Sequence, residues 1–391
     1  PEGLKEKDIQ TDLEEISDAF SAALKDSFLD FGAGHDQLTR ALLAALATKP
    51  FVILTGLSGS GKTQIALRLG EWFGPNRLYV AAVRPDWTGA EALFGFEDAL
   101  KETVNGRAAW NVPGPLEFIL AAVKDPQNPY LLLLDEMNLA HVERYFADVL
   151  SGMESKHACI PNLTKSAKDG LWRIDNDGQP RIPFPRNLFV IGTVNIDETT
   201  YVFSPKVLDR ANTFEFRVTT SDLRIDARKP VACEAGAPEL VRGFLALSRD
   251  DAWQDSHPAS YRDWLAAALR DVHAILARYS LEFGQRVFYE ALRFAAFAEA
   301  SGLVSREAVL DRILLQKILP RLHGSRRKLE LPLLALLCFS RNPADPLPAD
   351  DKVLAADPSA STGPALLPVT HFKLSRMLVA LRTNQFVSFT D

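Results

Sequence analysis

The chain has 391 residues, a length that favours two domains with extensions over a single core. Hydrophobic residues make up 47% and charged residues 24%, which is typical of a globular protein, and no apolar run reaches the roughly 18 residues that span a bilayer. The net charge of −6 argues against a protein whose whole surface coats nucleic acid, although it leaves room for a local basic patch.

The three cysteines, Cys159, Cys233 and Cys338, lie far apart and show no metal-ligand spacing. We expect unpaired, incidental thiols, which are typical of the reducing cytoplasm. No signal-peptide pattern opens the chain. The chain begins with Pro1 rather than Met, so the sequence leaves open whether a further N-terminal module precedes it.

Residues 1–35 are predicted to form a helical extension. Apolar side chains from Leu4 to Phe28 recur at steps of three to five residues, which gives a helix one apolar stripe. Fewer than four heptads are present, so a helix packed on the main body is favoured over a free coiled coil. A second helix is predicted from Asp36 to Thr48, and Lys49-Pro50 ends it.

Short apolar strands then alternate with helices over residues 36–219. Five strands are predicted, at residues 51–55, 78–83, 130–134, 188–193 and 213–217. A glycine-rich turn and a helix that ends near Phe73 follow the first of them. This alternation predicts an α/β fold in which helices cover both faces of a five-stranded parallel sheet.

Two irregular stretches interrupt this pattern, at residues 84–115 and 156–187. The first is rich in glycine, proline and aromatic residues. The second contains Asp177-Gly178 between the segments 171–174 and 181–182, and this arrangement predicts a hairpin turn.

Helical patterns dominate after about residue 220, for example at Tyr261–Tyr279. We expect an all-helical lid domain over residues 220–345. The last part, residues 346–391, is predicted to continue a proline-rich linker and then to form a helix at Phe372–Leu381 and a strand at Gln385–Phe389.

The strongest motif is a phosphate-binding loop between the first strand and the helix that follows it. Residues 56–63 read Gly-Leu-Ser-Gly-Ser-Gly-Lys-Thr and fit the pattern G-x-x-x-x-G-K-[ST] in full. Such a loop points its N–H groups at phosphate oxygens, and the helix adds the positive end of its dipole. The residues predicted to bind the nucleotide here are Gly56, Ser58, Gly59, Ser60, Gly61, Lys62 and Thr63. Lys62 is expected to reach the β- and γ-phosphates, and the Thr63 hydroxyl to coordinate Mg²⁺.

An acidic pair, Asp135-Glu136, directly follows the predicted strand at residues 130–134. Asp135 is predicted to hold Mg²⁺ through its water shell, and Glu136 to act as the general base that polarises the attacking water. A solvated turn is the alternative for two carboxylates after a strand, but the phosphate-binding loop earlier in the chain favours catalysis.

Two further residues are predicted to act on the γ-phosphate. Asn195 follows the fourth strand at the carboxyl edge of the sheet, where ligands bind, so its side chain is expected to position the attacking water. Arg210 precedes the fifth strand and is a candidate arginine finger for the nucleotide of a neighbouring subunit, with Lys206 as the fallback. The alternative is a surface arginine paired with Asp209.

Basic residues of the helical part are further candidates. Arg286 opens a helix and is predicted to contact the nucleotide from the lid. The densest basic cluster in the chain comprises Arg321, Arg326, Arg327 and Lys328. One interpretation of this cluster is a solvated face, and the other is contact with phosphate, nucleic acid or another subunit.

Together these motifs resemble the AAA+ superfamily of P-loop NTPases, and within it the McrB-type NTPases. The resemblance covers roughly residues 36–340, with a weaker similarity at 372–389. It rests on the stretches Val83–Thr88, Leu93–Phe96, Asp135–Glu154, Phe203–Arg210 and Leu319–Arg327.

The resemblance implies an insertion at residues 84–115, a hairpin at residues 156–187 and a hexameric ring. McrB-type proteins are the motor subunits of modification-dependent restriction systems, and an McrC-type partner that carries the nuclease stimulates them. For this chain the resemblance therefore implies Mg²⁺ as cofactor, ATP or GTP as substrate, a homo-oligomer, and contact with DNA directly or through the partner.

One departure from the family leaves the nucleotide open. The best-studied members use GTP, and their signature after the fourth strand reads Asn-Thr-x-Asp-Arg. Here residues 195–199 read Asn-Ile-Asp-Glu-Thr, without the arginine and with Asp197 in a shifted position. The sequence also shows neither a nuclease motif nor a module for reading methylated DNA, so any DNA cleavage is assigned to the partner.

Two other functions are compatible with these motifs. A MoxR-like AAA+ chaperone that remodels protein complexes shares the same insertions. A nucleotide-gated scaffold that binds without turnover is the third hypothesis, and Glu136 together with a finger candidate argues against it.

Overall fold

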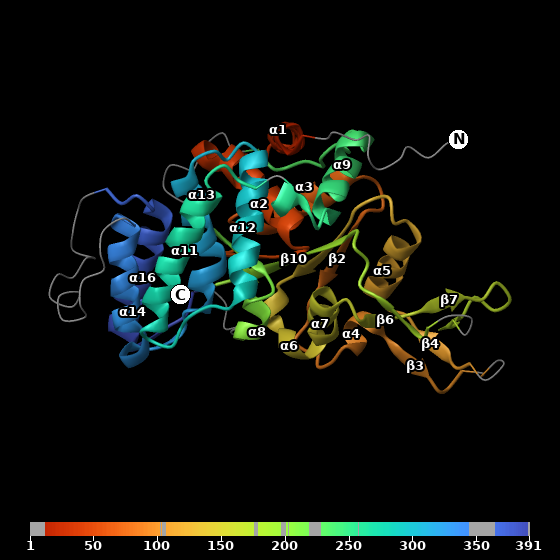
Figure 1. Ribbon diagram of the computed structural model, residues 1–391. Helices are drawn as coiled ribbons and strands as arrows, with labels where there is room; N and C mark the ends of the chain where they lie inside the picture. The colour runs from red at the N-terminus through yellow and green to blue at the C-terminus, as the bar shows by residue number, and fades with distance from the viewer. Residues whose placement is uncertain are drawn as a thin grey trace.

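A five-stranded parallel sheet forms the centre of the protein (Figure 1). The computed structural model describes residues 12–101, 103, 107–175, 179–196, 201, 203–218, 228–256, 258–343 and 364–389. The strands of the sheet are β1 (Phe51–Gly56), β2 (Leu78–Ala82), β5 (Tyr130–Asp135), β10 (Leu188–Asn195) and β11 (Asn212–Phe216). They lie in the order β11-β1-β10-β5-β2, and every neighbouring pair is parallel. All five predicted strands and the predicted α/β fold class are confirmed.

Apolar clusters cover both faces of the sheet at its central strands, where successive side chains point to opposite sides. In β1, Val52 and Leu54 join one apolar cluster, whereas Phe51 and Ile53 join another. The helices of the first cluster include α1 (Leu13–Asp26), α2 (His35–Thr48), α3 (Lys62–Phe73) and α9 (Pro238–Arg249). Those of the second are α4 (Glu91–Phe94), α5 (Gly114–Lys124), α6 (Val142–Tyr145), α7 (Ala147–Ser155) and α8 (Pro205–Leu208).

The predicted N-terminal helix is present from Leu13 onward and packs against α2. Its apolar stripe is fully buried at Ile16, Phe20 and Leu24. The short 3-10 turn η2 (Gly32–Gly34) precedes α2, and a second 3-10 turn, η3 (Met137–Leu139), follows β5. The first eleven residues of the predicted extension lie outside the described residues.

The two irregular stretches meet in one antiparallel sheet beside the core, at the right of Figure 1. Its strands are β3 (Phe96–Asp98), β4 (Ala109–Asn111), β8 (Trp172–Ile174) and β7 (Leu163–Lys165), in that order. A second antiparallel pair joins β6 (Ala158–Pro161) to β9 (Arg181–Pro183). Since β6 and β7 are consecutive and face β9 and β8, residues 158–183 form one long hairpin, as the family resemblance implies.

The turn of this hairpin lies at a different Asp-Gly step from the predicted one. Ser166 N–H donates to the Leu171 carbonyl over 2.9 Å, and Gly170 has a φ of +70°, so the chain reverses at Asp169-Gly170. The predicted step at Asp177-Gly178 lies outside the described residues, but its flanking strands pair with β7 and β6 rather than with each other. That prediction was wrong because both steps satisfy the local rule, and strand pairing selects the first.

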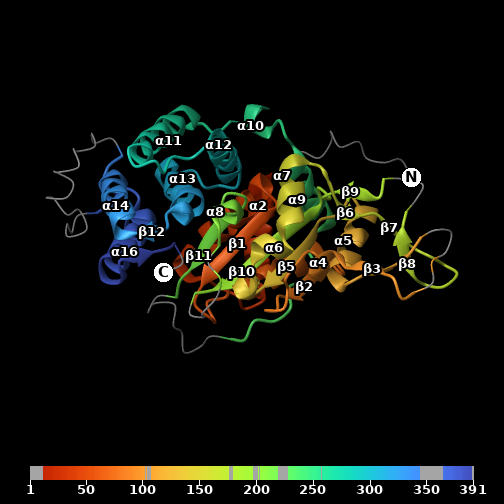
Figure 2. The ribbon, with the colours of Figure 1, turned by 90° about the horizontal axis from the view of Figure 1, so that it is seen from below.

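A helical body packs beside β11, at the left of both Figure 1 and Figure 2. Its helices are α10 (Trp253–Ser256), α11 (Arg262–Ala277), α12 (Gln285–Ala300), α13 (Arg306–Ile313), α14 (Arg326–Arg341) and α16 (Pro368–Asn384). Two turns, the π-type η5 (Leu314–Ile318) and the 3-10 turn η6 (Leu319–Arg321), extend α13. No helix in the described part of the chain is both long and apolar enough to cross a membrane.

The last described segment belongs to this helical body. Helix α16 packs against α14 and α13, and β13 (Phe386–Val387) pairs with β12 (Gly324–Ser325). The body is helical as predicted, apart from this two-residue ladder. The proposed domain limits remain predictions, and residues 344–363 of the predicted linker lie outside the described residues.

Asp311 of α13 holds the first turn of α16. Its carboxylate accepts hydrogen bonds from the N–H groups of Val369 (2.9 Å) and Thr370 (2.7 Å). Burial raises the pKa of Asp311, and these hydrogen bonds offset only part of that effect. Because a helix N-terminus favours negative charge, the cap ties α16 to α13.

A buried cluster of three charges joins the helical body to the core beside β1. Glu290 of α12 forms ion pairs of 2.5 Å with both Lys49 and Lys317 of η5. Burial favours a higher pKa for Glu290, but the charges of Lys317 and Lys49 outweigh it and lower the pKa to about 2. Burial and the charge of Lys317 lower the pKa of Lys49 to about 7. Each of the three charges therefore depends on the other two.

We expect Glu290→Gln to lower the free energy of unfolding by about 3–5 kcal/mol, because it leaves Lys49 and Lys317 buried without a carboxylate. Urea unfolding at pH 7 measures this loss. Since the pKa of Glu290 is lower in the folded state, its contribution is present above pH 4.5 and is lost as the pH falls toward about 2. Glu282→Gln, at an exposed position before α12, is the control and should change the free energy by less than about 0.5 kcal/mol. Equal stability of the two variants would contradict the role of the cluster.

Candidate nucleotide-binding site

The loop between β1 and α3 has the backbone geometry that phosphate binding requires. Gly56 has a φ of +151°, and a Cβ atom there would lie 2.2 Å from the carbonyl oxygen of Phe216. Gly61, with a φ of +93°, precedes α3 and offers no side chain to cap its first turn. Ser58 and Gly59 are exposed at the tip of the loop. The N–H groups at the start of α3 are therefore suited to binding an anion.

Lys62 is folded back onto this loop. Its ammonium group is buried and donates to the carbonyl oxygens of Gly56 (2.8 Å) and Leu57 (2.6 Å), with the Ser60 hydroxyl at 3.4 Å. These acceptors are neutral, so phosphate oxygens would be stronger partners for the same ammonium group. The loop thus keeps a positive charge in place beside the uncapped end of α3.

Three hydroxyl and carboxylate groups meet at the ends of β5 and β10. The Thr63 hydroxyl donates to Asp135 Oδ1 over 3.0 Å, and the Thr193 hydroxyl donates to the same oxygen over 2.7 Å. Thr193 also accepts the N–H of Glu136 over 2.9 Å. Hydroxyl and carboxylate oxygens are the donors that Mg²⁺ prefers, so Thr63 and Asp135 fit the predicted ion, with Thr193 orienting the carboxylate.

The predicted base and the predicted sensor are in direct contact. Glu136 has a left-handed backbone, with a φ of +53°, and Asn195 Nδ2 donates to its Oε1 over 3.1 Å. An amide that donates to a carboxylate fixes the orientation in which that carboxylate can accept a proton from water. The structure thus brings Glu136 and Asn195 together next to Asp135.

A cavity of 690 Å³ opens beside the phosphate-binding loop. Its walls include Gly59–Gly61 of the loop, Phe31 from the segment before α2, and Phe216 at the end of β11. The helical body contributes Leu315 and Phe372. A cavity of this size, with apolar and aromatic walls next to a phosphate site, is suited to a nucleoside.

Several cations at this cavity were not predicted from the sequence. Arg217, Arg312 and Lys373 line it. Lys373 of α16 is buried and forms an ion pair of 3.0 Å with Glu215 of β11, which also pairs with Arg376 over 3.2 Å. No local motif marks these residues, because only the packing of α16 against the end of β11 brings them to the loop.

Comparisons with known proteins give three similarities. The McrB subunit of the type IV methyl-directed restriction enzyme EcoKMcrB, from Escherichia coli strain K12, is 25% identical over 182 residues. The matched stretch is 44% of this chain and spans only 36% of the McrB subunit. A family model described as a domain of unknown function (DUF8727) matches residues 242–386. A solved structure of a candidate ATPase from Cytophaga hutchinsonii has a TM-score of 0.46 and 16% identity, covering 78% of this chain and 88% of that one.

The chain is similar to McrB over part of its length, and its five-stranded parallel sheet and helical body agree with that similarity. The structure joins the features on which the resemblance to AAA+ proteins rests: the parallel sheet, the phosphate-binding loop after β1, the acidic pair after β5, Asn195 after β10 and the helical body that follows.

The two predicted arginines lie together, away from the phosphate-binding loop. Arg210 Nε donates to Glu154 Oε2 over 2.5 Å, and Arg286 forms an ion pair with the other oxygen of Glu154. Neither arginine lines the cavity beside the phosphate-binding loop. Arg210 pairs with Glu154 of α7, and Asp209 pairs instead with Arg321 over 2.8 Å. The catalytic role of Arg210 and the nucleotide contact of Arg286 remain predictions.

The predicted basic cluster is divided between separate contacts. Arg321 pairs with Asp209, and Arg326 pairs with Glu330 over 2.7 Å, while Arg327 and Lys328 are exposed. Lys206, the fallback for the finger, is exposed on α8, and Asp197 lies outside the described residues.

Replacing Thr193 should weaken Mg²⁺ binding. Thr193→Val keeps the shape but removes the hydrogen bond that orients Asp135, so we expect the Mg²⁺ concentration needed for nucleotide binding to rise about tenfold or more. Titration of a fluorescent nucleotide at increasing Mg²⁺ measures this shift.

Thr213→Val is a matched control on the neighbouring region of the sheet. The Thr213 hydroxyl is buried in β11 and has no hydrogen-bond partner, so its loss should leave the Mg²⁺ dependence unchanged. The same shift in both variants would indicate a general effect of removing a hydroxyl from the sheet and would contradict the role of Thr193.

Proposed function

We propose that this chain is a Mg²⁺-dependent nucleoside triphosphate hydrolase and the motor subunit of an McrBC-like restriction or anti-phage defence system. The observation that carries the proposal is the hydrogen-bonded series from Thr63 through Asp135 and Thr193 to Glu136 and Asn195. A protein that only binds nucleotide needs Thr63 and Asp135 for Mg²⁺. Hydrolysis also needs a general base and a group that orients this base.

Each residue of the series has a role in the proposed hydrolysis. Lys62 exchanges the loop carbonyls for phosphate oxygens when the nucleotide binds. Glu136 accepts a proton from the attacking water, and Asn195 holds the carboxylate of Glu136 in place. Thr63 and Asp135 would hold Mg²⁺, which when bound would neutralise charge on the phosphates.

The site is proposed to be completed by a second subunit. Arg210 lies outside the cavity of its own subunit, which suits a finger that acts on the γ-phosphate of a neighbour. We therefore propose a homo-oligomeric ring, with the hexamer of McrB-type proteins as the model.

The cellular role is proposed from the similarity to McrB. In this role the ring works in the cytoplasm with an McrC-type partner, which supplies DNA cleavage, and contacts DNA directly or through that partner. The 25% identity to McrB over 182 residues supports it over the chaperone alternative.

Hydrolysis of ATP and GTP by the purified chain tests the enzymatic part of the proposal. We expect Mg²⁺-dependent release of phosphate that falls about 100-fold or more in Glu136→Gln, because a general base contributes roughly that factor. Glu136→Gln should still bind a fluorescent nucleotide, whereas Lys62→Ala should not bind it.

The preferred nucleotide separates the cellular roles. Faster turnover of GTP than of ATP would support an McrB-like motor, and a preference for ATP would favour a chaperone or a divergent defence ATPase. Undiminished turnover in Glu136→Gln would contradict the proposed base.

Addition of an McrC-type protein tests the proposed partner. We expect a purified McrC-type partner from the same genome to raise the turnover of the wild-type ring and to leave Glu136→Gln inactive. Unchanged turnover at saturating partner would contradict the McrBC-like assignment while leaving the NTPase intact.

A further inference from the structure

The segment just before β11, which carries Arg210, is held largely by the helical body. Arg321 of η6 forms an ion pair of 2.8 Å with Asp209 Oδ1. Arg286 of α12 donates to the Asp209 carbonyl over 3.5 Å, and Lys317 of η5 donates to the Ala211 carbonyl over 3.5 Å. Lys49 of the core adds a hydrogen bond of 3.3 Å to the Asp209 carbonyl. The position of the residues on either side of Arg210 therefore depends on the position of α12, η5 and η6.

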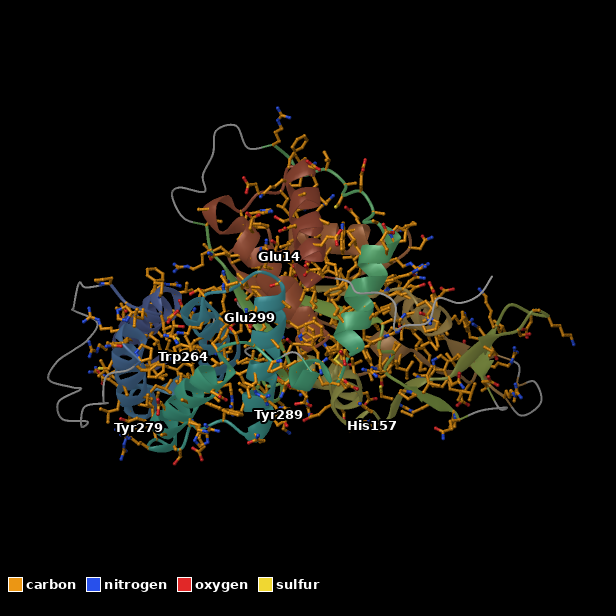
Figure 3. All side chains as sticks on the ribbon, turned by 45° about the horizontal axis from the view of Figure 1, so that its top comes forward. Glu14, His157, Trp264, Tyr279, Tyr289 and Glu299 are labelled. Carbon is orange, nitrogen blue, oxygen red and sulfur yellow. The ribbon has the colours of Figure 1, made fainter. Side chains whose placement is uncertain are left out.

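Glu154 of α7 links Arg210 itself to the same body. Its two carboxylate oxygens are divided between Arg210, at 2.5 Å, and Arg286. Figure 3 labels Tyr289 near the N-terminal end of α12 and His157 just beyond α7, and these two helix ends lie along the same edge of the molecule. Arg286 therefore approaches Glu154 from the helical body, and Arg210 approaches it from the core.

The charge of this cluster suits a phosphate from another subunit. Two guanidinium groups share one carboxylate, so one positive charge is left over. Arg210 is 28% exposed and Arg286 is 39% exposed, so the cluster remains accessible from solvent. Guanidinium groups bind phosphate in a fixed geometry, and that geometry requires the side chain to be held in place.

The elements that hold this segment also reach the nucleotide cavity. Arg312 and Leu315 line the cavity, and Lys317 lies only two residues after Leu315 in the π-type turn η5. The turn η6, with Arg321, follows directly. One continuous stretch of the helical body therefore contacts the cavity at one end and the segment of Arg210 at the other.

We propose that Arg286 is a positioning residue for the arginine finger and that it acts through Glu154 and Asp209. It holds Arg210 in the orientation that the nucleotide of the neighbouring subunit requires. Through η5, that orientation depends on whether nucleotide occupies the cavity of the same subunit. This inference rests on the proposed hydrolysis in a ring. It assigns Arg286 a role in trans, in place of a contact with the nucleotide of its own subunit.

A mixing experiment distinguishes the two roles of Arg286. Each active site needs Glu136 of its own subunit and Arg210 of the next, so Arg286→Ala and Glu136→Gln damage opposite sides of an interface. We expect each variant alone to be slow, with Arg286→Ala reduced about tenfold or more. In a randomly mixed ring about a quarter of the interfaces are intact, so the mixture should hydrolyse faster than either variant alone.

Action in cis predicts the opposite result. If Arg286 read the nucleotide of its own subunit, no interface in the mixture would be complete and the rate would not rise above the average of the two variants. That result would overturn the inference.

Further variants exclude a merely structural effect. Arg286→Lys should recover part of the rate, and Glu154→Gln should complement Glu136→Gln in the same way as Arg286→Ala. Arg278→Ala, at an exposed position directly after α11, should leave turnover unchanged. Failure of Glu154→Gln to complement would contradict the link through Glu154.

The mixture of Arg210→Ala with Glu136→Gln separates this inference from the proposed function. Recovery in that mixture, without recovery for Arg286→Ala, would overturn the role of Arg286 alone. No recovery for Arg210→Ala would overturn the finger in the proposed function and the inference with it.

Discussion

The parallel pairing of β10 with β1 on one side and with β5 on the other is the constraint on which the site depends. In this register Gly56 lies opposite Asn195, and Gly192 lies opposite Leu134. Side chains two residues apart share a face of a strand, so Thr193 and Asn195 point the same way. Thr193 contacts Asp135, and Asn195 contacts Glu136. A slip of one residue would turn both polar side chains to the opposite face.

The same edge of the sheet explains why Lys62 is folded back on its loop. A buried ammonium group without partners is costly, and the carbonyls of Gly56 and Leu57 satisfy it at the end of β1. Those carbonyls are held close to the neighbouring strand, since Gly56 approaches the backbone of Phe216. Phosphate oxygens replace neutral acceptors by charged ones, so the change of partners favours the bound state.

The sequence was sufficient for the parts of the site that local patterns encode. The five strands, the phosphate-binding loop and the pair Asp135-Glu136 each follow from runs of neighbouring residues. Thr193 could have been found as a polar residue within an apolar strand, but its partner is set by the pairing of β10 with β5. The turn at Asp169-Gly170 was missed for a related reason, because strand pairing decides between two equivalent Asp-Gly steps.

Contacts between segments that are distant in the sequence could not be predicted from local patterns. Lys373 reaches Glu215 only because α16 packs beside the end of β11, and nothing near Lys373 in the sequence indicates a nucleotide cavity. Arg286 was assigned to the nucleotide because it opens a helix of the lid. Its position beside Arg210 depends on Glu154, which is far from both in the sequence and is an ordinary helical residue by pattern.

Ion pairs connect the helical body to the core at two sites, the nucleotide cavity and the segment before β11 that carries Arg210. Lys373 meets Glu215 at the cavity, and Arg321 meets Asp209 before β11, whereas α12 packs on α2 through apolar contact. A half-buried charge that leaves its partner is costly unless it finds another. When the helical body moves relative to the core, each charged group is therefore expected to exchange one charged partner for another, and the ion pairs do not lengthen gradually. A phosphate bound in the cavity offers such a partner to Lys373. The cations around Asp209 belong to the same helical body, so we expect the cavity and the segment before β11 to respond together.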